Sequence, residues 1–247
     1  MKLSATIVAL NEERNIVRAI ESLHGADEIV VVDSGSRDRT REVARILGAR
    51  VIEEPWRGYA AQKNFAAECA SNDWILSLDA DESVGEVLEA EILELKQDGP
   101  GCDAYSMPRL AQYCGRWIRH SGWYPDRKVR LYHRGRARWI GDFVHESVSV
   151  QGNIGRLDGH LLHFTCNSIA EHLRTLDRYT SLAARELVAR GAPLPYWKLL
   201  LDPAWTFFRT YLVQQGFRDG AQGFTIARMA SLYTRLKYSK ARELAGK

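Results

Sequence analysis

The sequence is poor in cysteine and has no long hydrophobic run. Its four cysteines form no CxxC pair and have no partner histidines at metal-site spacing, so we expect reduced thiols in a cytoplasmic protein and no zinc site. The stretch nearest to a membrane span, residues 195–213, is interrupted by Lys198, Asp202 and Arg209, whereas a spanning helix needs about 20 apolar residues. The chain is therefore not predicted to cross a membrane.

Signal-peptide features, internal repeats and low-complexity segments are also absent. The N-terminal stretch MKLSATIVALNEER is followed by no small-residue cleavage site and becomes charged at once, so we interpret it as a first strand. The chain has 247 residues, 45% of them hydrophobic and 26% charged. This composition is typical of a folded protein with one large domain, or a domain with an appendage.

Short β-rich runs alternate with helical patterns over the first hundred residues. The expected strands are 4–9, 28–32, 50–53 and 74–78, and the expected helices are 13–23, 39–47, 60–70 and 84–96. This βαβ alternation predicts an α/β fold with a Rossmann-like, mostly parallel sheet. Shorter strands then predict an α+β second half over residues 101–165, and a helical pattern fills residues 166–247.

Polar side chains follow three of the expected strands at their carboxyl ends. Asn11 and Glu12 follow the first strand, Asp33 follows the second, and Asp79 and Asp81 follow the fourth. Ligands of parallel sheets bind at these ends, so we expect the five side chains to share one rim.

Dense positive charge is expected beside this acidic rim. Residues 105–138 contain nine Arg or Lys and a single acid, Asp126. A phosphate group would fit between the two kinds of charge.

Asp33 has two interpretations. The dinucleotide folds that place a ribose-binding acid here need a glycine-rich turn after the first strand, and ALNEERN has no glycine. Asp33 in DSGSRDRT could instead form a turn in which Asp and Ser side chains bond their own backbone ahead of a helix. Turn and ligand site both stay open.

The acids of WILSLDADES also allow two interpretations. A single carboxylate near a helix N-terminus contributes about 0.3–1 kcal/mol and needs no further explanation; we assign this role to Glu82, at the start of the next helix. Asp79 and Asp81 stand one residue apart at a strand end. Such a pair favours a hard cation, Mg²⁺ or Mn²⁺, which completes its shell with water and substrate phosphate.

Several motifs together resemble one enzyme family. TIVALNEERN, VVVDSGSRDRT, the triplet Gln62-Lys63-Asn64 and ILSLDADE occur in the order and approximate spacing of family 2 glycosyltransferases, which have the GT-A fold. The segments GYAAQKNFAAECASNDWILSLDADE and PDRKVRLYHRGRARWIGDFVHE are similar to the lipopolysaccharide core β-glucosyltransferase branch. The resemblance covers residues 1–165, and the GF-x-DG segment at 216–220 extends it into the tail.

The resemblance implies a role for each matching position. Nucleotide-sugar binding falls to Asn11, Glu12, Asp33, Lys63 and Asp79. Within this set Asp33 would bond the nucleobase, and Asp79 would contact the ribose or the metal. Lys63 would lie near the phosphates or the Asp33 carboxylate. Asp81 would ligate the metal on the diphosphate. Ala9 and Leu10 stand where proline and an aromatic residue often occur in the family, so stacking on the base by that aromatic is absent.

The acceptor hydroxyl must lose its proton, and a positioned carboxylate accelerates such a step about 10²–10⁴-fold. The resemblance favours Glu146 of GDFVHE, with Asp126 and Asp142 as rivals and a solvent-facing strand residue as the alternative. His145 should point to the opposite face of a regular strand. His163 in LLHFT is either a histidine of the core or a metal ligand.

The C-terminal residues differ in charge from the rest. Residues 1–165 carry a net charge of −4 and residues 166–247 one of +7. The tail is rich in aromatic side chains, and Arg228, Arg235 and Arg242 recur every seven residues along its last helix. These features suit an anionic membrane surface; a helical subdomain packed on the catalytic core or on another subunit is the alternative.

We therefore predict a metal-dependent inverting glycosyltransferase, cytoplasmic and peripheral at the inner face of the inner membrane. Residues 1–100 would bind the donor, 101–165 the acceptor, and 166–247 would lie near the membrane. The resemblance implies UDP-glucose as the donor and the lipid-anchored lipopolysaccharide inner core as the acceptor; a polyprenyl-linked or capsular acceptor is the alternative. A sugar nucleotidyltransferase would carry a glycine-rich loop after the first strand. Nucleic-acid binding is disfavoured by the acidic rim and the lack of a recognised motif.

Overall fold

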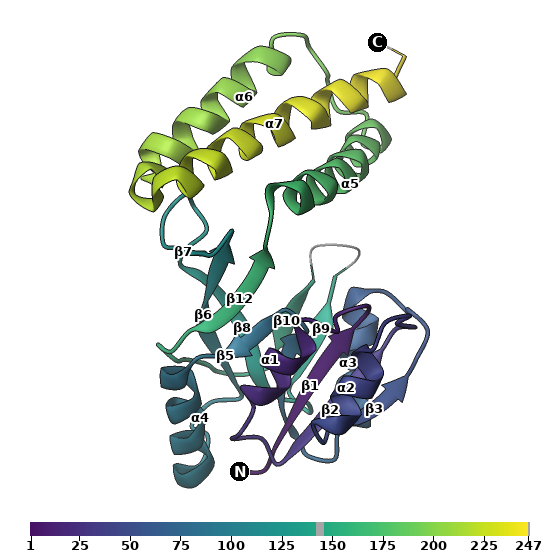
Figure 1. The fold of residues 1–247 in the computed structure, drawn as a ribbon, viewed down its shortest axis with the longest axis vertical. Helices are drawn as coiled ribbons and strands as arrows, with labels where there is room; N and C mark the ends of the chain where they lie inside the picture. Colours follow the sequence, from purple (N-terminus) through teal and green to yellow (C-terminus); the bar gives the residue numbers. More distant parts are fainter. Residues whose placement is uncertain (142–145, 247) are drawn as a thin grey trace. The chain divides into compact units, whose positions relative to one another are not determined.

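The computed structural model describes residues 1–141 and 146–246, and the chain divides into two compact units (Figure 1). Unit 1 comprises Met1–Arg109 and Asp126–His163, and unit 2 comprises Leu110–Pro125 and Phe164–Lys247. The sequence predicted one boundary after residue 165, whereas the structure places it after His163 and adds the segment 110–125 to unit 2. This segment belongs with the C-terminal helices because its Tyr113 and Ile118 share a buried cluster with Ile226.

The main sheet has ten strands and begins as the predicted parallel sheet. Its order is β3-β2-β1-β4-β8-β6-β12-β5, with β7 and β11 also paired to β6. Strands β1 to β4 pair in parallel, whereas β8 pairs antiparallel with β4 and β6. The strands are β1 (Leu3–Ala9), β2 (Glu28–Asp33), β3 (Arg50–Glu53), β4 (Trp74–Asp79), β5 (Glu82–Val84), β6 (Ala104–Tyr113), β7 (Arg116–Ile118), β8 (Asp126–His133), β11 (Ile154–Arg156) and β12 (Leu161–Cys166).

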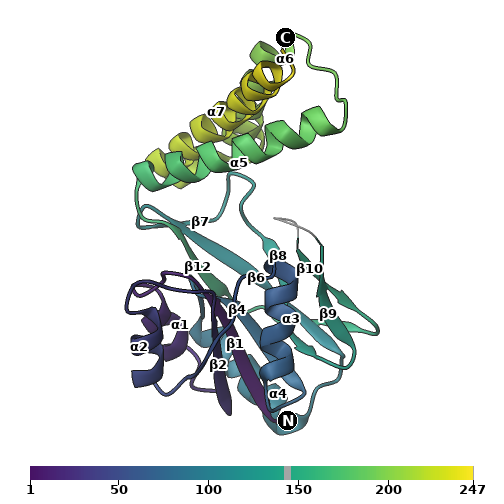
Figure 2. The same ribbon diagram turned by 90° about the vertical axis from the view of Figure 1, so that its right-hand side faces the viewer.

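Helices cover both faces of the parallel part. Alternate residues of β2 explain this, since Val31 packs in the cluster that contains α1 (Ile16–Glu21), α2 (Thr40–Ile46) and α4 (Glu86–Asp98), whereas Val30 and Val32 pack with α3 (Tyr59–Cys69). Figure 2 shows α1 and α2 on one side of β1 and β2 and α3 on the other. Each buried valine stabilises the fold by about 1.5–3 kcal/mol relative to an exposed one. The predicted α/β class with an α+β second half is confirmed.

A separate hairpin of β9 (Ala137–Ile140) and β10 (Ser147–Val150) pairs antiparallel. The sequence pattern predicts a strand over residues 143–150, and within the described residues β10 begins at Ser147. Asp142 and His145 lie outside the described residues.

Unit 2 is built on α5 (Ile169–Ala189), α6 (Lys198–Phe208) and α7 (Gly220–Leu244), with a π-helical turn η1 (Arg209–Val213) and a 3₁₀ turn η2 (Gly216–Asp219) between the last two. Helix α7 packs against both α5 and α6. Among the described helices, every one is too short or too polar to span a bilayer.

The GF-x-DG segment has a structural role in unit 2. Asp219 is buried, and its carboxylate accepts hydrogen bonds from the backbone N–H groups of Arg119 and His120 and from the hydroxyl of Ser121. A Cβ at Gly223 would lie 1.8 Å from the carbonyl oxygen of Gly216, so only glycine fits there. The segment therefore joins η2 to the loop after β7.

Candidate functional site

The predicted acidic rim is present in unit 1. Asp33 is the last residue of β2 and Asp79 the last residue of β4. Both strands pair with β1, in which Ala9 lies opposite Asp33 and Val8 lies opposite Asp79. The two aspartates thus stand at the carboxyl ends of strands on either side of β1, where parallel sheets bind ligands.

Asp33 forms the turn predicted from the sequence, and its role as a ligand site stays a prediction. Its Oδ2 accepts hydrogen bonds from the backbone N–H groups of Gly35 (3.0 Å) and Ser36 (2.9 Å), which is the predicted turn. The side chain is fully buried, and its Oδ1 has no hydrogen-bond partner in residues 1–141 and 146–246. A buried carboxylate oxygen without a partner is costly, so a donor group that reached this atom would be bound favourably.

Asn11 and Glu12 connect the loops that follow β1 and β2. The Asn11 backbone N–H donates to Ser36 Oγ at 2.8 Å, and the Arg37 N–H donates to Asn11 Oδ1 at 2.8 Å. The Glu12 N–H donates to Thr40 Oγ1 at 2.8 Å. Asn11 has φ = 56°, a left-handed conformation that asparagine tolerates better than most residues. The pair therefore holds the predicted nucleotide pocket in shape.

The triplet on α3 joins three segments of unit 1. Gln62 Nε2 donates to Ser34 Oγ at 3.2 Å, next to Asp33. Asn64 exchanges two hydrogen bonds of 2.9 Å with the backbone of Trp139. Lys63, between them, points to the end of β4. Three consecutive residues thus align the ends of β2 and β4 with β9.

Lys63, Asp79, Arg130 and Glu146 form the central charge cluster. The Lys63 Nζ lies 2.7 Å from Asp79 Oδ1 and 3.2 Å from Glu146 Oε1, and Arg130 donates to Asp79 Oδ2 at 2.7 Å. Both cationic side chains are only 4% exposed. They also lie over the ring of Trp139, with Lys63 Nζ at 4.3 Å and Arg130 Cζ at 5.2 Å from its centre. Cation–π attraction therefore adds to the ion pairs.

The two cations determine the charge of Asp79. Burial raises the pKa of the Asp79 carboxyl, but Arg130 and Lys63 lower it by a larger amount. The pKa of Asp79 therefore lies well below its usual range. Burial lowers the pKa of Arg130, whereas Asp79 and Glu82 raise it, with a net increase. Both groups therefore stay ionised near neutral pH.

The prediction for Glu82 was wrong. It lies in β5, where it pairs with His163 of β12, and not at the start of α4. The side chain is 1% exposed; its Oε1 accepts from Arg130 at 2.7 Å and Arg109 at 3.4 Å, and its Oε2 accepts from the Asp79 N–H at 3.0 Å. Glu82 and Asp79 therefore accept hydrogen bonds from the same guanidinium nitrogen of Arg130 and hold it in place together.

Asp81 faces His163. The Nε2 of His163 lies 3.2 Å from Asp81 Oδ2, and both side chains are partly exposed. A carboxylate and an imidazole are suitable ligands for Mn²⁺, and an ion that keeps water and diphosphate oxygens needs few protein ligands. Within the described chain there is no group of three or more His, Cys, Asp or Glu side chains that could hold a metal. Asp79, the other predicted ligand, has each oxygen in an ion pair with a cation.

The rivals of Glu146 are placed differently. Asp126 is paired with Arg109 at 2.7 Å and Lys128 at 3.0 Å. Burial raises its pKa, but Lys128 and Arg109 lower it, so that the net shift is downward. Asp126 is therefore linked to Glu82 through Arg109, whereas Glu146 is paired with Lys63. Asp142 cannot be compared because it lies outside the described residues.

Arg109, Arg130 and Trp139 are site residues that the sequence did not single out. The charge excess of residues 105–138 predicted cations beside the rim, and the structure confirms this. The three acids near the end of β4 were the signal that a buried cation belongs there.

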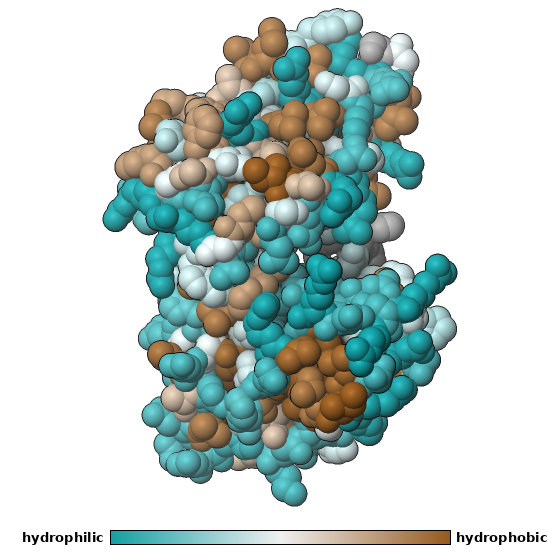
Figure 3. All heavy atoms as spheres, in the orientation of Figure 1, coloured by the Kyte–Doolittle hydropathy of each residue, from teal (hydrophilic) through white to brown (hydrophobic). Residues whose placement is uncertain are grey.

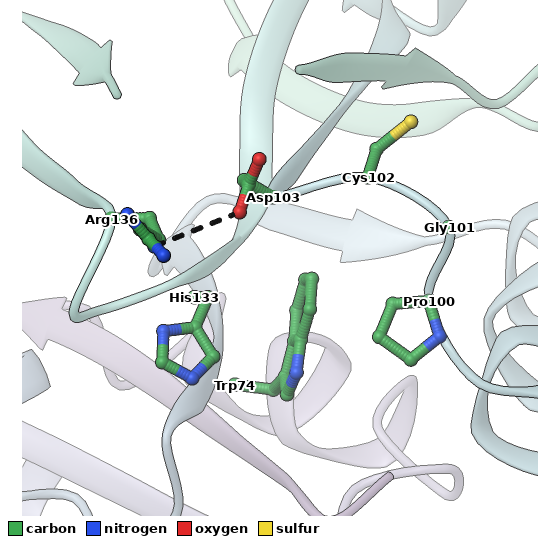
Figure 4. Close-up of a pocket in the computed structure, with 7 residues that line it drawn as sticks. All are labelled: Trp74, Pro100, Gly101, Cys102, Asp103, His133 and Arg136. Carbon is green, nitrogen blue, oxygen red and sulfur yellow. Dashed lines mark ion pairs between the residues drawn. The ribbon is translucent and has the colours of Figure 1, made fainter. Parts of the chain in front are cut away.

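A cavity elsewhere in unit 1 contains none of the predicted residues. It has a volume of about 370 Å³ and is lined in part by Trp74, Asp103, His133 and Arg136. Figure 4 shows the Trp74 ring standing between His133 and Pro100, with the Asp103–Arg136 pair above it. Trp74 begins β4 and His133 ends β8, so this cavity lies at the end of β4 opposite to the charge cluster.

Comparisons with known proteins agree with the resemblance. Residues 4–155 match the model of the family described as Glycosyl transferase family 2. The chain is 34% identical over 255 residues to the lipopolysaccharide core biosynthesis glycosyltransferase LpsC of Rhizobium meliloti (strain 1021), covering 97% of this chain and 92% of LpsC. It is 32% identical over 256 residues to the uncharacterized glycosyltransferase RT0209 of Rickettsia typhi, covering 99% and 88%. A solved mycobacterial protein has a similar fold, with a TM-score of 0.50 and 18% identity over 78% of this chain and 75% of that one.

Proposed function

The chain belongs to glycosyltransferase family 2 and has a GT-A type fold, and from this premise we propose that it transfers glucose from UDP-glucose onto the inner core of lipopolysaccharide. The observation that carries the proposal is the arrangement at the end of β4. There Asp79 is paired with the buried side chains of Lys63 and Arg130, and Asp81, two residues further along the chain, faces His163. The name of LpsC supports the choice of acceptor class.

Asp33 and the residues at the end of β4 would bind different parts of the donor. The free Oδ1 of Asp33 would accept a hydrogen bond from the nucleobase. Asp81 and His163 would hold Mg²⁺ or Mn²⁺, which offsets the charge of the leaving diphosphate. Asp79 would bond the ribose while Lys63 and Arg130 keep it ionised and fixed. Because Lys63 and Arg130 are buried and already paired with Asp79, these three groups would need little reorganisation during the reaction.

Glu146 would remove the proton from the acceptor hydroxyl. Lys63 lies 3.2 Å from its Oε1 and so holds the carboxylate in position. The hydroxyl oxygen then attacks the anomeric carbon as the bond to the diphosphate breaks. Such a single displacement inverts the configuration and forms a β-linkage from an α-linked donor.

Unit 2 would bring the enzyme to its acceptor. Lipopolysaccharide is anchored in a membrane, and we place the chain at the cytoplasmic face of the inner membrane as a peripheral protein. The support is the net charge of +7 over residues 166–247, since each basic side chain near an anionic leaflet contributes about 1 kcal/mol to binding.

A nucleotide-sugar screen tests the reaction. We expect UDP-glucose with Mg²⁺ or Mn²⁺ to raise the melting temperature and to release UDP when truncated lipopolysaccharide is added, with a β-linkage visible by NMR. If turnover occurs only with a polyprenyl-linked or capsular acceptor, that acceptor replaces lipopolysaccharide in the proposed reaction. Release of pyrophosphate, or no stabilisation by any nucleotide-sugar, would refute the proposed reaction.

A further inference from the structure

Helix α6 and the turn after it expose an apolar stripe. Leu200, Leu201, Trp205, Phe208 and Leu212 are between 46% and 71% exposed, and their spacing places them on one helical face. In a globular protein such a face normally packs against the core. Figure 3 shows apolar side chains gathered over α6 and α7. An exposed apolar surface of this kind marks a binding site.

A groove lies between α6 and α7 beside this stripe. Its volume is about 480 Å³, within the roughly 300–1,000 Å³ of ligand pockets. Leu200, Pro203, Phe207 and Phe224 form apolar walls. Such walls would accept a hydrocarbon chain.

Two arginines of α7, Arg228 and Arg235, also line the groove. They stand seven residues apart, about two helical turns, so they lie on one face of the helix. Both are exposed, and neither forms an ion pair with any described residue. Arg228 instead lies over the Phe224 ring, 5.8 Å from its centre. Arg242, third in the sequence pattern, is buried and takes no part.

We propose that this groove binds one anionic phospholipid of the bilayer, with an acyl chain between the apolar walls and the phosphate on Arg228 and Arg235. The charge of the surface selects this occupant over a second copy of the chain. Unit 2 carries 15 basic and 6 acidic side chains, so two such surfaces would repel each other. The proposal rests on the membrane contact proposed above and adds a discrete lipid site to it.

Co-sedimentation of the full chain with vesicles tests the site. One set of vesicles is phosphatidylcholine alone, and the other contains phosphatidylglycerol as well. We expect the unchanged chain to bind the second set more tightly. The double variant Arg228→Ala/Arg235→Ala should lose on the order of 30-fold in affinity, which corresponds to two cations at about 1 kcal/mol each.

Three further variants distinguish lipid binding in the groove from general electrostatic attraction to the vesicle surface. Arg174→Ala/Arg185→Ala removes the same charge from exposed positions of α5 and should weaken binding less than threefold. Ser231→Phe fills the groove without changing any charge and should reduce binding about tenfold. Arg228→Lys/Arg235→Lys should bind nearly as well as the unchanged chain.

The overturning results are equally definite. Equal losses in the α5 and α7 double variants, or full binding by Ser231→Phe, would refute a discrete lipid site. A dimer that Ser231→Phe converts to monomer would assign the groove to a second copy. UDP release from UDP-glucose in the absence of vesicles should be the same in every variant, so failure of the lipid site is distinguishable from failure of the proposed transferase.

Discussion

Unit 1 and unit 2 use charge in different ways. Unit 1 carries 19 basic and 25 acidic side chains, and its central cations are buried against the acids of the β4 end. Unit 2 has 15 basic and 6 acidic side chains. It also holds 14 of the 21 large apolar side chains that are exposed in the described residues. Unit 1 therefore pairs its central charges inward, whereas unit 2 has an excess of cations and exposes more of its large apolar side chains.

The largest expected effect comes from the exposed edge of the unit 1 site. Asp81→Asn should abolish measurable turnover of UDP-glucose, since a proposed ligand of the ion that stabilises the leaving charge is lost. The fold should persist because Asp81 is partly exposed and its ion-pair partner within the described residues is the partly exposed His163. UDP release and thermal melting measure the two properties.

The control for this variant is Asp98→Asn, at the exposed end of α4. It removes the same charge from unit 1 and should leave turnover unchanged. Unchanged turnover in Asp81→Asn would remove Asp81 from the site.

Glu146→Gln should lower kcat by about 10²–10⁴-fold, because the general base is lost while the amide keeps the shape of the side chain. Stabilisation by UDP-glucose should remain, since the variant leaves Asp33, Asp79 and Asp81 intact. The rival Asp126→Asn should have a smaller effect on kcat. If it has the larger effect, the base has been misassigned.

Arg130→Met tests how much the buried ion pairs of unit 1 contribute to the free energy of unfolding. It leaves Asp79 and Glu82 without their shared buried cation, and removal of one partner from such a network costs about 3–5 kcal/mol. The matched change in unit 2 is Arg190→Met, which breaks an exposed pair with Glu186 and should cost about 0.5 kcal/mol or less. Urea unfolding gives both values. Similar losses in the two variants would erase the contrast between the units.

The sequence predicted the parallel half of unit 1 because its information there is local. Strands such as β2, with alternate faces of Val30, Val31 and Val32, are visible in a short window, and so are the acids at their ends. Asp33, Asp79 and Asp81 were found in this way, and the structure places Asp33 and Asp79 at the two strand ends expected of them. The roles assigned to them in catalysis stay predictions.

The missed features depend on distant pairing. Glu82 lies in a three-residue strand whose partner, His163, is about 80 residues away. Arg130 was one of nine cations in its segment, and only the register of β8 on β4, with Leu76 opposite Leu131, brings it to Asp79. For Lys63, the placement of α3 gives pairing with Asp79 and Glu146 in place of Asp33, and its expected position near the phosphates stays a prediction. No local pattern encodes these registers.

The smallest expected effect is a difference between the two units in how their free energy of unfolding depends on pH. In unit 1, burial raises the pKa of Glu28, but bonds from Ser4, Ser71 and Arg50 lower it, with a net fall from 4.5 to about 2. A depressed carboxyl pKa stabilises the fold above pH 4.5, and this stabilisation is lost as the pH falls toward 2. In unit 2, burial lowers the pKa of His172 below 6.5. The unfolded chain therefore binds a proton at this ring before the folded chain does, and the free energy of unfolding decreases as the pH falls below 6.5.

Two substitutions separate these pH windows. Glu28→Gln should flatten the acid dependence of the unfolding free energy below pH 4.5, and His172→Asn should flatten it only between pH 6.5 and the lowered value. Both are measured by urea unfolding across pH, and the His172 ring can be titrated directly by NMR. A ring that titrates at or above 6.5 would contradict the burial argument for unit 2. An acid dependence that survives Glu28→Gln unchanged would show that other carboxyls of unit 1, Asp79 first among them, account for the acid sensitivity of its paired charges.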